Sequence, residues 1–135
     1  MSRAALAVAG YMRKAERALD EARLLLRDKK TEGACSRAYS AMHDAAHAAL
    51  LATGSESPEA MIKTHPGLIA EFGKKLVLGG RIDATFGRMF NRVQDMRRLA
   101  DYSAEPPPID ETRSAVEQAE AFVAAMRSLI ERLTL

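Results

Sequence analysis

Residue types that stabilise many small folds are scarce in this chain of 135 residues. It has one cysteine, Cys35, no tryptophan, and only 5% aromatic residues. A single cysteine cannot form an internal disulfide, which excludes a domain held together by its own disulfide bonds. The shortage of aromatic residues disfavours a β-sandwich, whereas a core of Ala, Leu, Val and Met suits closely packed helices. The length allows one domain over residues 1–135 with its own hydrophobic core.

Long uncharged apolar segments are also lacking. The mildly apolar N-terminal segment is interrupted by Arg3, and no window reaches the roughly 18 apolar residues that a membrane-spanning helix requires. Nothing resembles a secretion signal, so we expect a cytoplasmic protein with no membrane association. The net charge of +2 is too small to indicate a nucleic-acid partner by itself.

The distribution of charge is more informative than its sum. Residues 74–98 contain seven basic and two acidic side chains, whereas residues 105–135 contain six acidic and three basic ones. Two explanations stay open. The two segments could be complementary neighbouring helices, or the basic segment could face a phosphate-rich partner.

Apolar residues recur with helical spacing in five segments. We predict helices at residues 5–28, at 31 or 34 to 52, at 66–76, at 82–103, and from Asp110, which we expect to cap the last helix. Polar or helix-breaking residues separate them at 29–33, 53–58, 79–80 and 106–108. Thr64 followed by Pro66 is typical of a helix N-terminus. The predicted fold is all-α, a four- to five-helix up-down bundle.

Three of the predicted helices carry recognisable buried stripes. An almost pure alanine face, which permits close approach of a neighbour, marks the helix at 31–52 as central: Ala34, Ala38, Ala41, Ala45, Ala49 and Ala52. The first helix has a stripe at Tyr11, Ala15, Ala18, Ala22 and Leu25. The helix at 82–103 is expected to bury Phe86, Met89, Phe90, Val93, Met96 and Ala100.

Candidate functional residues lie at the edges of two of these stripes. Arg97 is aligned with the apolar stripe of its helix, and a guanidinium there is costly to desolvate unless it has a partner. Asp101 is one turn further on, so Arg97 and Asp101 form an i, i+4 pair, while Arg98 and Tyr102 form a second pair on the more exposed side. The first pair could serve a polar cleft or act only as a structural ion pair.

The helix at 31–52 carries polar residues of its own. Arg37 and Asp44 lie on one flank, and the polar face beside them holds Ser36, Ser40, His43 and His47. If the two helices pack, this cluster and the one around Arg97 could line a single groove. His43 and His47 have the i, i+4 spacing of a helical metal pair, but no third ligand is close in sequence, and a surface or interface pair is favoured. The sequence therefore predicts no metal site and no cofactor.

Three segments together resemble the HEPN domain family. They are Ser-Arg-Ala-Tyr-Ser-Ala-Met at 36–42, Lys-Thr-His-Pro-Gly-Leu at 63–68, and Arg-Arg-Leu-Ala-Asp-Tyr at 97–102. The resemblance is to a small prokaryotic subgroup with an Arg-x-x-x-Asp-Tyr signature and covers about residues 10–130. The chain departs from the subgroup at Ser40, where a second aromatic residue is usual, and at His43 and Asp44, where Phe-His is usual.

The resemblance implies a helical bundle, commonly a homodimer, often paired with a small nucleotidyltransferase in toxin–antitoxin-like modules. It suggests a binding module whose RNA, nucleotide or phosphate contacts come from Arg37, Arg97, Arg98, Asp101 and Tyr102. In that arrangement Asp101 would hold Arg97 in position, and Tyr102 could stack on a base. A purely structural dimeric adaptor is the alternative without nucleic acid.

Many relatives in the family are metal-independent ribonucleases with a late Arg-x(4–6)-His signature. Neither Arg97 nor Arg98 is followed by a histidine at that spacing. Arg37 and His43 meet the spacing on the helix at 31–52, but their side chains would point about 120° apart on a regular helix. The sequence therefore gives no confident catalytic assignment. Arg97 and His43 are the candidates if the chain is a divergent ribonuclease toxin.

Overall fold

Helices make up the whole regular structure of the described part of the chain. The computed structural model describes residues 2–54 and 65–133. Within those ranges there is no β-strand, and the elements are α1 (Arg3–Arg27), α2 (Thr31–Ala52), α4 (His65–Phe72), the π-helical segment η1 (Gly73–Val77), α5 (Ala84–Tyr102) and α6 (Ile109–Leu133). The prediction of an all-α bundle is confirmed.

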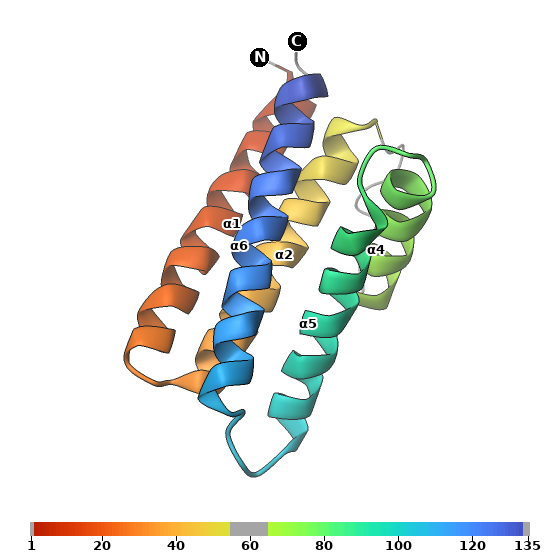
Figure 1. The fold of residues 1–135 in the computed structure, drawn as a ribbon. Coiled ribbons are helices and arrows are strands. Elements are labelled where there is room, and N and C mark those ends of the chain that lie inside the picture. Colours follow the sequence, from red (N-terminus) through yellow and green to blue (C-terminus); the bar gives the residue numbers. More distant parts are fainter. Residues whose placement is uncertain (1, 55–64, 134–135) are drawn as a thin grey trace.

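Four long helices alternate in direction. In Figure 1, α1 and α5 run downward while α2 and α6 run upward, and the two chain ends meet at the top. The central position predicted for α2 is confirmed, because α2 packs against α1, α4, α5 and α6. The short α4 lies beside α5 at the edge of the bundle.

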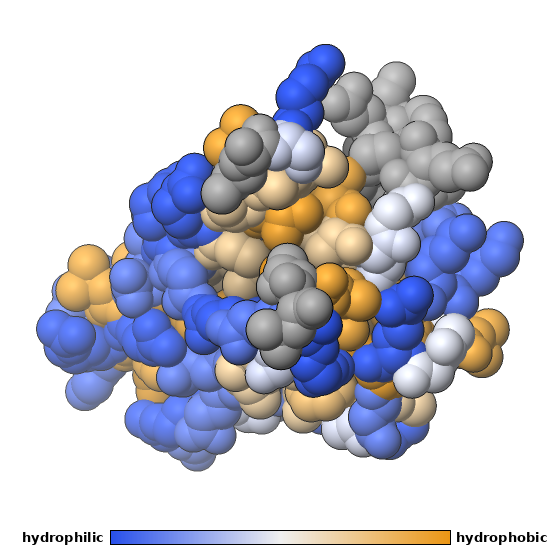
Figure 2. Space-filling view, turned by 90° about the horizontal axis from the view of Figure 1, so that it is seen from above, coloured by the Kyte–Doolittle hydropathy of each residue, from blue (hydrophilic) through white to orange (hydrophobic). Residues whose placement is uncertain are grey.

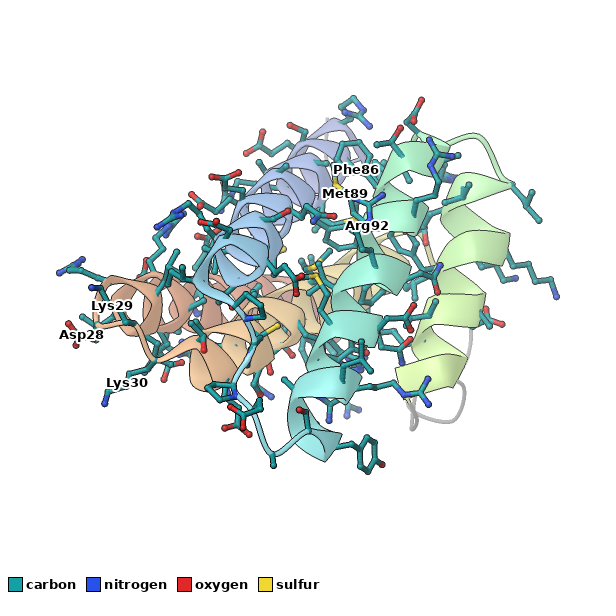
Figure 3. The ribbon with its side chains drawn as sticks, turned by 60° about the horizontal axis from the view of Figure 1, so that its bottom comes forward. Asp28, Lys29, Lys30, Phe86, Met89 and Arg92 are labelled. Atoms are coloured by element: carbon teal, nitrogen blue, oxygen red, sulfur yellow. The ribbon has the colours of Figure 1, made fainter. Side chains whose placement is uncertain are left out.

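The turn between α1 and α2 follows from local hydrogen bonding. Ser2 caps α1, its Oγ accepting a hydrogen bond from the Ala5 amide at 3.0 Å. At the other end Lys29 takes the left-handed conformation (φ 60°), and the Lys30 amide donates to the Leu25 carbonyl at 2.8 Å. This reversal lets α2 begin at Thr31 as the antiparallel neighbour of α1. Figure 3 shows Asp28, Lys29 and Lys30 at the end of this turn.

The third predicted helix is present but ends differently from a regular α-helix. The Leu78 amide donates to the Gly73 carbonyl at 2.9 Å, an i→i+5 bond that widens the last turn. The predicted break at 79–80 is confirmed. A side chain at Gly79 would place its Cβ 2.4 Å from the Lys75 carbonyl oxygen, and Gly80 has φ 76°. The predicted cap at Thr64 and most of the predicted loop at 53–58 lie outside the described residues.

The start of α6 corrects one prediction. Asp110 was expected to cap this helix, but α6 already begins at Ile109 and Asp110 lies in its first turn, paired with Arg113 at 3.1 Å. The Pro108 carbonyl accepts hydrogen bonds from both the amide and the Oγ1 of Thr112, at 3.0 and 2.9 Å. The helix can therefore start directly after the proline corner, and Asp110 only complements the helix dipole.

The core combines small residues around α2 with an aromatic cluster beyond it. The alanines predicted on the α2 stripe are fully buried, except for Ala52, which is half-buried. Phe72, Phe90 and Phe122 join α4, α5 and α6, with ring centroids 5.0–5.5 Å apart. On α5 the predicted stripe is buried at Phe90, Val93 and Ala100. Its remaining members, Phe86, Met89 and Met96, are partly buried against the core.

The contact between α5 and α6 has a polar component. Figure 3 shows Phe86, Met89 and Arg92 on the side of α5 that faces α6. Arg92 donates a hydrogen bond from Nη1 to Gln118 Oε1 at 2.9 Å. Among the described residues no ion pair joins the basic segment 74–98 to α6. The ion pairs of α6 with another helix are made with α1: Arg23 of α1 contacts Glu120 of α6 at 3.1 Å, and Glu16 of α1 contacts Arg127 of α6.

The end of the bundle at which the termini meet is apolar. Figure 2 shows hydrophobic residues gathered at the centre of this end, with hydrophilic ones around them. They surround a hollow of about 480 Å³ lined by Ala4, Ala5, Val8, Ala9, Met12, Leu51, Ala52, Ile130 and Leu133. None of the described helices is long and apolar enough to cross a membrane.

The aromatic cluster gives a prediction about stability. Phe90→Ala should lower the free energy of unfolding by about 3–5 kcal/mol, because a fully buried ring is lost and its neighbours cannot refill the space. The matched control is Leu99→Ala on the same helix, where the side chain is 71% exposed and the expected change is within about 0.5 kcal/mol. Urea denaturation of both variants measures the difference, and equal losses would contradict this description of the core.

Candidate functional site

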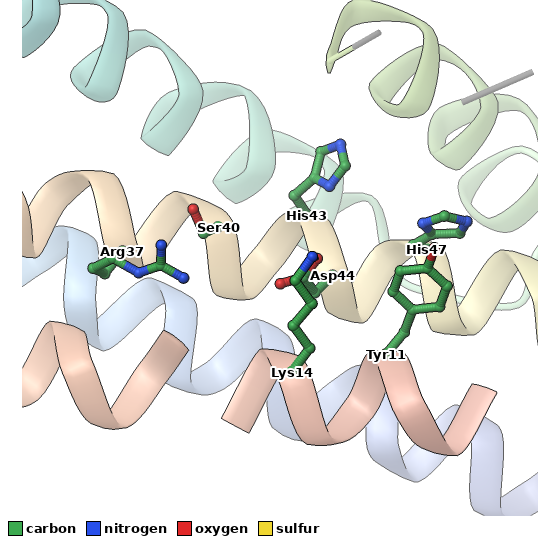
Figure 4. A pocket seen from close by; sticks show the side chains of 7 residues that line it. All are labelled: Tyr11, Lys14, Arg37, Ser40, His43, Asp44 and His47. Carbon is green, nitrogen blue, oxygen red and sulfur yellow. The ribbon is translucent and has the colours of Figure 1, made fainter. Parts of the chain in front are cut away.

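A polar hollow of about 400 Å³ lies between α1 and α2. Figure 4 shows the seven side chains that line it, two from α1 and five from α2: Tyr11, Lys14, Arg37, Ser40, His43, Asp44 and His47. Below, we call these seven residues the α1–α2 cavity. It is the place where the described part of the chain concentrates charged, aromatic and imidazole groups.

Helical spacing explains why α2 supplies most of the cavity. Residues three and four apart share one face of a helix, so Arg37, Ser40, Asp44 and His47 form a strip beside the face that carries the buried alanines. The sequence placed Arg37 and Asp44 on one flank of this helix and Ser36, Ser40, His43 and His47 on the polar face beside it. In the structure Asp44 and His47 are buried, and Ser36 does not line the cavity. Arg37 and His43 both line the cavity despite the angle predicted between them, because the long arginine reaches along the helix. Figure 4 shows its guanidinium directed toward Ser40 and Asp44.

Asp44 is a nearly buried carboxylate among cations. Its side chain is 8% exposed, and its Oδ1 lies 3.9 Å from Lys14 Nζ, too far for a hydrogen bond. No described residue therefore donates a hydrogen bond to the Asp44 carboxylate. Burial raises the pKa of Asp44, while the charges of Lys14, Arg37 and Arg17 lower that pKa and offset part of the effect. The carboxylate therefore sits in a positive environment without a close donor.

Arg37 is held loosely at the other end of the cavity. Its Nε lies 3.6 Å from Glu21 Oε1, and this buried nitrogen has no hydrogen-bond acceptor among the described residues. A guanidinium offers five donors in a planar fork that matches carboxylate and phosphate oxygens. The hydrogen-bonding capacity of Arg37 is thus largely unused within this part of the chain.

Two stacked rings close the cavity at the end away from Arg37. The rings of Tyr11 and His47 have centroids 3.9 Å apart with 29° between their planes. Figure 4 shows the two side chains side by side. Tyr11 was assigned to the buried stripe of the first helix from the sequence, but it is only half-buried and its ring contacts α2. Lys14, one turn further along α1, was not identified from the sequence at all. Its nearest signal was the i, i+3 spacing from Tyr11.

Arg97, which belongs to α5, packs against the opposite flank of α2. Its guanidinium carbon lies 5.2 Å from the centroid of the Tyr39 ring, and its Nε lies 3.4 Å from Asp101 Oδ2. The predicted Arg97–Asp101 pair is confirmed. The Arg97 side chain is 27% exposed, so water still reaches the pair. Tyr39 itself is buried, and this burial raises the pKa of its phenol to about 12.

The residues predicted for one groove are distributed over two surfaces. Arg37 lines the α1–α2 cavity, whereas Arg97, Arg98, Asp101 and Tyr102 do not. Arg98 is exposed and the Tyr102 side chain is 87% exposed, with no contact between the two among the described residues. The polar strip of α2 separates these surfaces, with α1 on one side and α5 on the other, as Figure 4 shows. Ligand binding by these five residues stays a prediction.

The two histidines of α2, His43 and His47, have the i, i+4 spacing of a helical metal pair. Within residues 2–54 and 65–133, no group of three or more His, Cys, Asp or Glu side chains is arranged to hold a metal ion. His47 stacks on Tyr11, and the His43 ring lies 6.1 Å from the Tyr39 ring. Both imidazoles are thus placed against aromatic side chains.

The sequence of the chain matches a known family and several known proteins. The model of the HEPN domain matches residues 8–132. A "UPF0332 protein" of Thermotoga maritima is 31% identical over 124 residues, covering 91% of this chain and 90% of that protein. A protein of Methanocaldococcus jannaschii named "Putative toxin" is 33% identical over 119 residues, covering 88% and 85%. A "UPF0332 protein" of Gloeobacter violaceus is 35% identical over 91 residues, covering 67% and 68%. The chain belongs to the HEPN domain family.

Proposed function

We propose that this HEPN protein is an RNA-binding module of a toxin–antitoxin-like system. The observation that carries the proposal is the α1–α2 cavity, which combines two cations with a stacked aromatic pair. Phosphate oxygens need fixed positive charge and N–H donors, and unpaired bases stack on flat rings. Of the common biological ligands, a single-stranded nucleic acid or a nucleotide offers both groups at once, and the family context favours RNA.

Arg37 and Lys14 have different parts in this proposal. Arg37 binds two oxygens of one phosphate through its planar fork, since its donors are largely unused within the described chain. Lys14 extends from α1 with an exposed side chain and acts as a point charge for the same or a neighbouring phosphate. The Tyr11–His47 stack then lies at the far end of the cavity as a platform for a base.

The α5 flank extends the proposed contact surface. Arg98 and Tyr102 are exposed, so a phosphate and a base can reach them without rearrangement of the bundle. Asp101 orients Arg97 through their ion pair. The basic segment 74–98 supports this role, because its arginines are not neutralised by ion pairs with α6 in the described part of the chain.

The proposed assembly follows the family context. We infer that the chain belongs to the subgroup with the Arg-x-x-x-Asp-Tyr signature, forms a homodimer, and pairs with a small nucleotidyltransferase. A relative named "Putative toxin" supports the toxin–antitoxin setting. The half-buried polar residues Ser36, Ser40 and His43 of the otherwise buried α2 are the surface that we assign to the dimer seam.

A metal-independent ribonuclease is the second candidate function. One observation favours it: Arg37, Ser40 and His43 line the same cavity, with Arg37 and His43 at the spacing of the family's catalytic signature. In this alternative Arg37 stabilises the negative charge on the phosphoryl oxygens of the pentavalent transition state, and His43 transfers a proton. The pair lies on α2, however, and the late signature after Arg97 is missing, so binding remains the leading function.

The first functional prediction concerns RNA binding. Arg37→Ala and Lys14→Ala should each weaken binding of a labelled single-stranded RNA by about tenfold and lower the salt dependence of binding by about one ion. Arg37→Lys should recover only part of the loss, because a lysine cannot bind two oxygens in a fixed plane. Fluorescence anisotropy at several salt concentrations measures these effects.

Arg113→Ala is the matched control for this titration. Arg113 is an exposed arginine on α6 that pairs with Asp110, away from the cavity. Its removal lowers the net charge by the same amount as Arg37→Ala. Equal weakening by the two substitutions would mean that binding depends on overall charge, and the proposed cavity would be wrong.

The second prediction separates binding from cleavage. The purified protein should bind structured and unstructured RNAs without cutting them, because no late Arg-x(4–6)-His signature is present. Labelled RNAs are incubated with and without EDTA and resolved on a denaturing gel. Cutting that is insensitive to EDTA and disappears in His43→Ala would establish the ribonuclease alternative instead.

The third prediction concerns Arg97 and its two structural contacts. Arg97→Ala should lower the free energy of unfolding by about 1–2 kcal/mol, because a partly exposed ion pair and a cation–π contact are lost together. RNA binding should weaken in the same variant. Urea denaturation and the binding titration are run side by side, with Arg113→Ala as the control in both.

Other results would change the role of Arg97. A loss of about 3–5 kcal/mol with unchanged RNA binding would identify a structural clamp, because a loss of that size is typical when one partner of a buried ion pair is removed. The double variant Arg97→Met with Asp101→Asn should then recover most of that stability. Arg97 would in that case be removed from the proposed RNA surface.

A further inference from the structure

We propose that Asp44 makes the α1–α2 cavity selective for RNA over DNA by accepting a hydrogen bond from a ribose 2′-hydroxyl group. This inference rests on the proposed function and defines its substrate class more closely. It assigns the carboxylate a role that neither the phosphate contacts nor the stacked rings can fill.

The first argument is the unused hydrogen-bonding capacity of Asp44. Its side chain is 92% buried (8% exposed), yet among the described residues its only charged contact is Lys14 at 3.9 Å, and no donor lies within hydrogen-bond distance. Buried carboxylates in folded proteins normally accept several hydrogen bonds, since desolvation without them is costly. A donor brought by a ligand would restore these bonds.

The second argument is the position of Asp44 among the cations. The carboxylate lines the same cavity as Lys14 and Arg37, the residues proposed to bind phosphate. An acidic group repels phosphate, so a ligand that binds its phosphate in such a cavity gains if it also offers the carboxylate a hydrogen-bond donor close to that phosphate. In RNA the 2′-hydroxyl is carried by the carbon next to the one that bears the 3′-phosphate. DNA has no donor at that place.

The third argument is the order of groups along α2. Arg37, Asp44 and His47 follow one another on the same face: the Arg37 guanidinium reaches along the helix toward Asp44, and His47 follows roughly 5 Å further along the helix axis. Along α2 the cavity therefore presents a guanidinium that can donate hydrogen bonds to phosphate, then a carboxylate, then a stacking surface. A nucleotide presents its phosphate, ribose and base in that order, and the 2′-hydroxyl is the feature that distinguishes RNA from DNA.

An amino group on a base is the competing donor for Asp44, because carboxylates also accept hydrogen bonds from cytosine. Uracil has no exocyclic amino group, so oligonucleotides of uridine isolate the contribution of the sugar. The experiment compares four labelled oligonucleotides of equal length by anisotropy: oligo(U), oligo(dU), 2′-O-methyl oligo(U) and oligo(C). The 2′-O-methyl group keeps the oxygen but removes the donor.

For the wild-type protein we expect oligo(U) to bind about tenfold more tightly than oligo(dU), which corresponds to one hydrogen bond to a charged group. The 2′-O-methyl oligonucleotide should bind as weakly as oligo(dU), and this arm needs no protein variant. Equal affinity for oligo(U) and oligo(dU) would overturn the inference while leaving RNA binding by the cavity intact. A failure to bind any of the four would overturn the proposed function as well.

The variants test the residue itself. Asp44→Ala should bind oligo(U) and oligo(dU) equally, and Asp44→Asn should keep part of the preference because its amide oxygen still accepts a hydrogen bond. Asp20→Ala is the matched control, an exposed aspartate of α1 that pairs with Arg23 and should leave the preference unchanged. Asp44→Asn should fold at neutral pH, since burial already disfavours the charged carboxylate.

Two results would contradict the assignment of the contact to Asp44. Retention of the full RNA preference in both Asp44 variants would show that another group recognises the 2′-hydroxyl. A preference for oligo(C) over oligo(U) that disappears in Asp44→Ala would show that the carboxylate contacts a base, and the sugar contact would be wrong.

Discussion

The close packing of α1 against α2 is the constraint on which the rest of the structure depends. Both helices present fully buried alanines, including Ala15 and Ala18 on α1 and Ala41 and Ala45 on α2. Small side chains let the two backbones approach, and the α1–α2 contact is the most extensive in the bundle. At this separation Tyr11 reaches the His47 ring and Lys14 lies near Asp44. Larger residues at the alanine positions would separate the helices and disperse the cavity.

The central helix α2 has two roles, one in the core of the bundle and one at its surface. Its buried stripe holds the bundle together, while its polar strip carries charged and imidazole groups between two neighbouring helices. The rigid alanine face fixes the orientation of the polar strip, because α2 cannot rotate without disturbing contacts with α1, α5 and α6. A carboxylate as buried as Asp44 is tolerated there only because cations surround it.

The structure shows how the basic segment 74–98 and the acidic segment 105–135 are arranged. α6 forms ion pairs of both polarities with α1, Arg23–Glu120 and Glu16–Arg127, whereas the polar contact between α5 and α6 is made by Arg92 with the neutral Gln118. The two oppositely charged segments are therefore neighbours without ion pairs between their described residues. The basic charge of α5 remains on the surface, at the flank that we propose extends the RNA contact beyond the α1–α2 cavity.

Local sequence signals were sufficient for most of the helices but not for the site. Alanine spacing, the glycines at 79–80 and the prolines at 106–108 predicted the order of the helices and most of their ends, because such signals act within one or two turns. The start of α6 was misplaced by two residues, since a helix capped by Asp110 would begin at residue 111 whereas α6 begins at Ile109, where the Pro108 carbonyl accepts the first helical hydrogen bonds itself. The polar strip of α2 was also predictable, because it depends only on the helical repeat.

The tertiary structure decided which helix faces that strip. The sequence suggested α5 as the partner, with Arg97 and Arg37 in one groove, whereas α1 contributes Tyr11 and Lys14 and Arg97 packs on Tyr39 at the other flank. Helical periodicity determines the angle between side chains on one helix but not the distance between two helices. That distance depends on how alanine faces far apart in the sequence pack together, and it decides which charges come close enough to act on the same ligand.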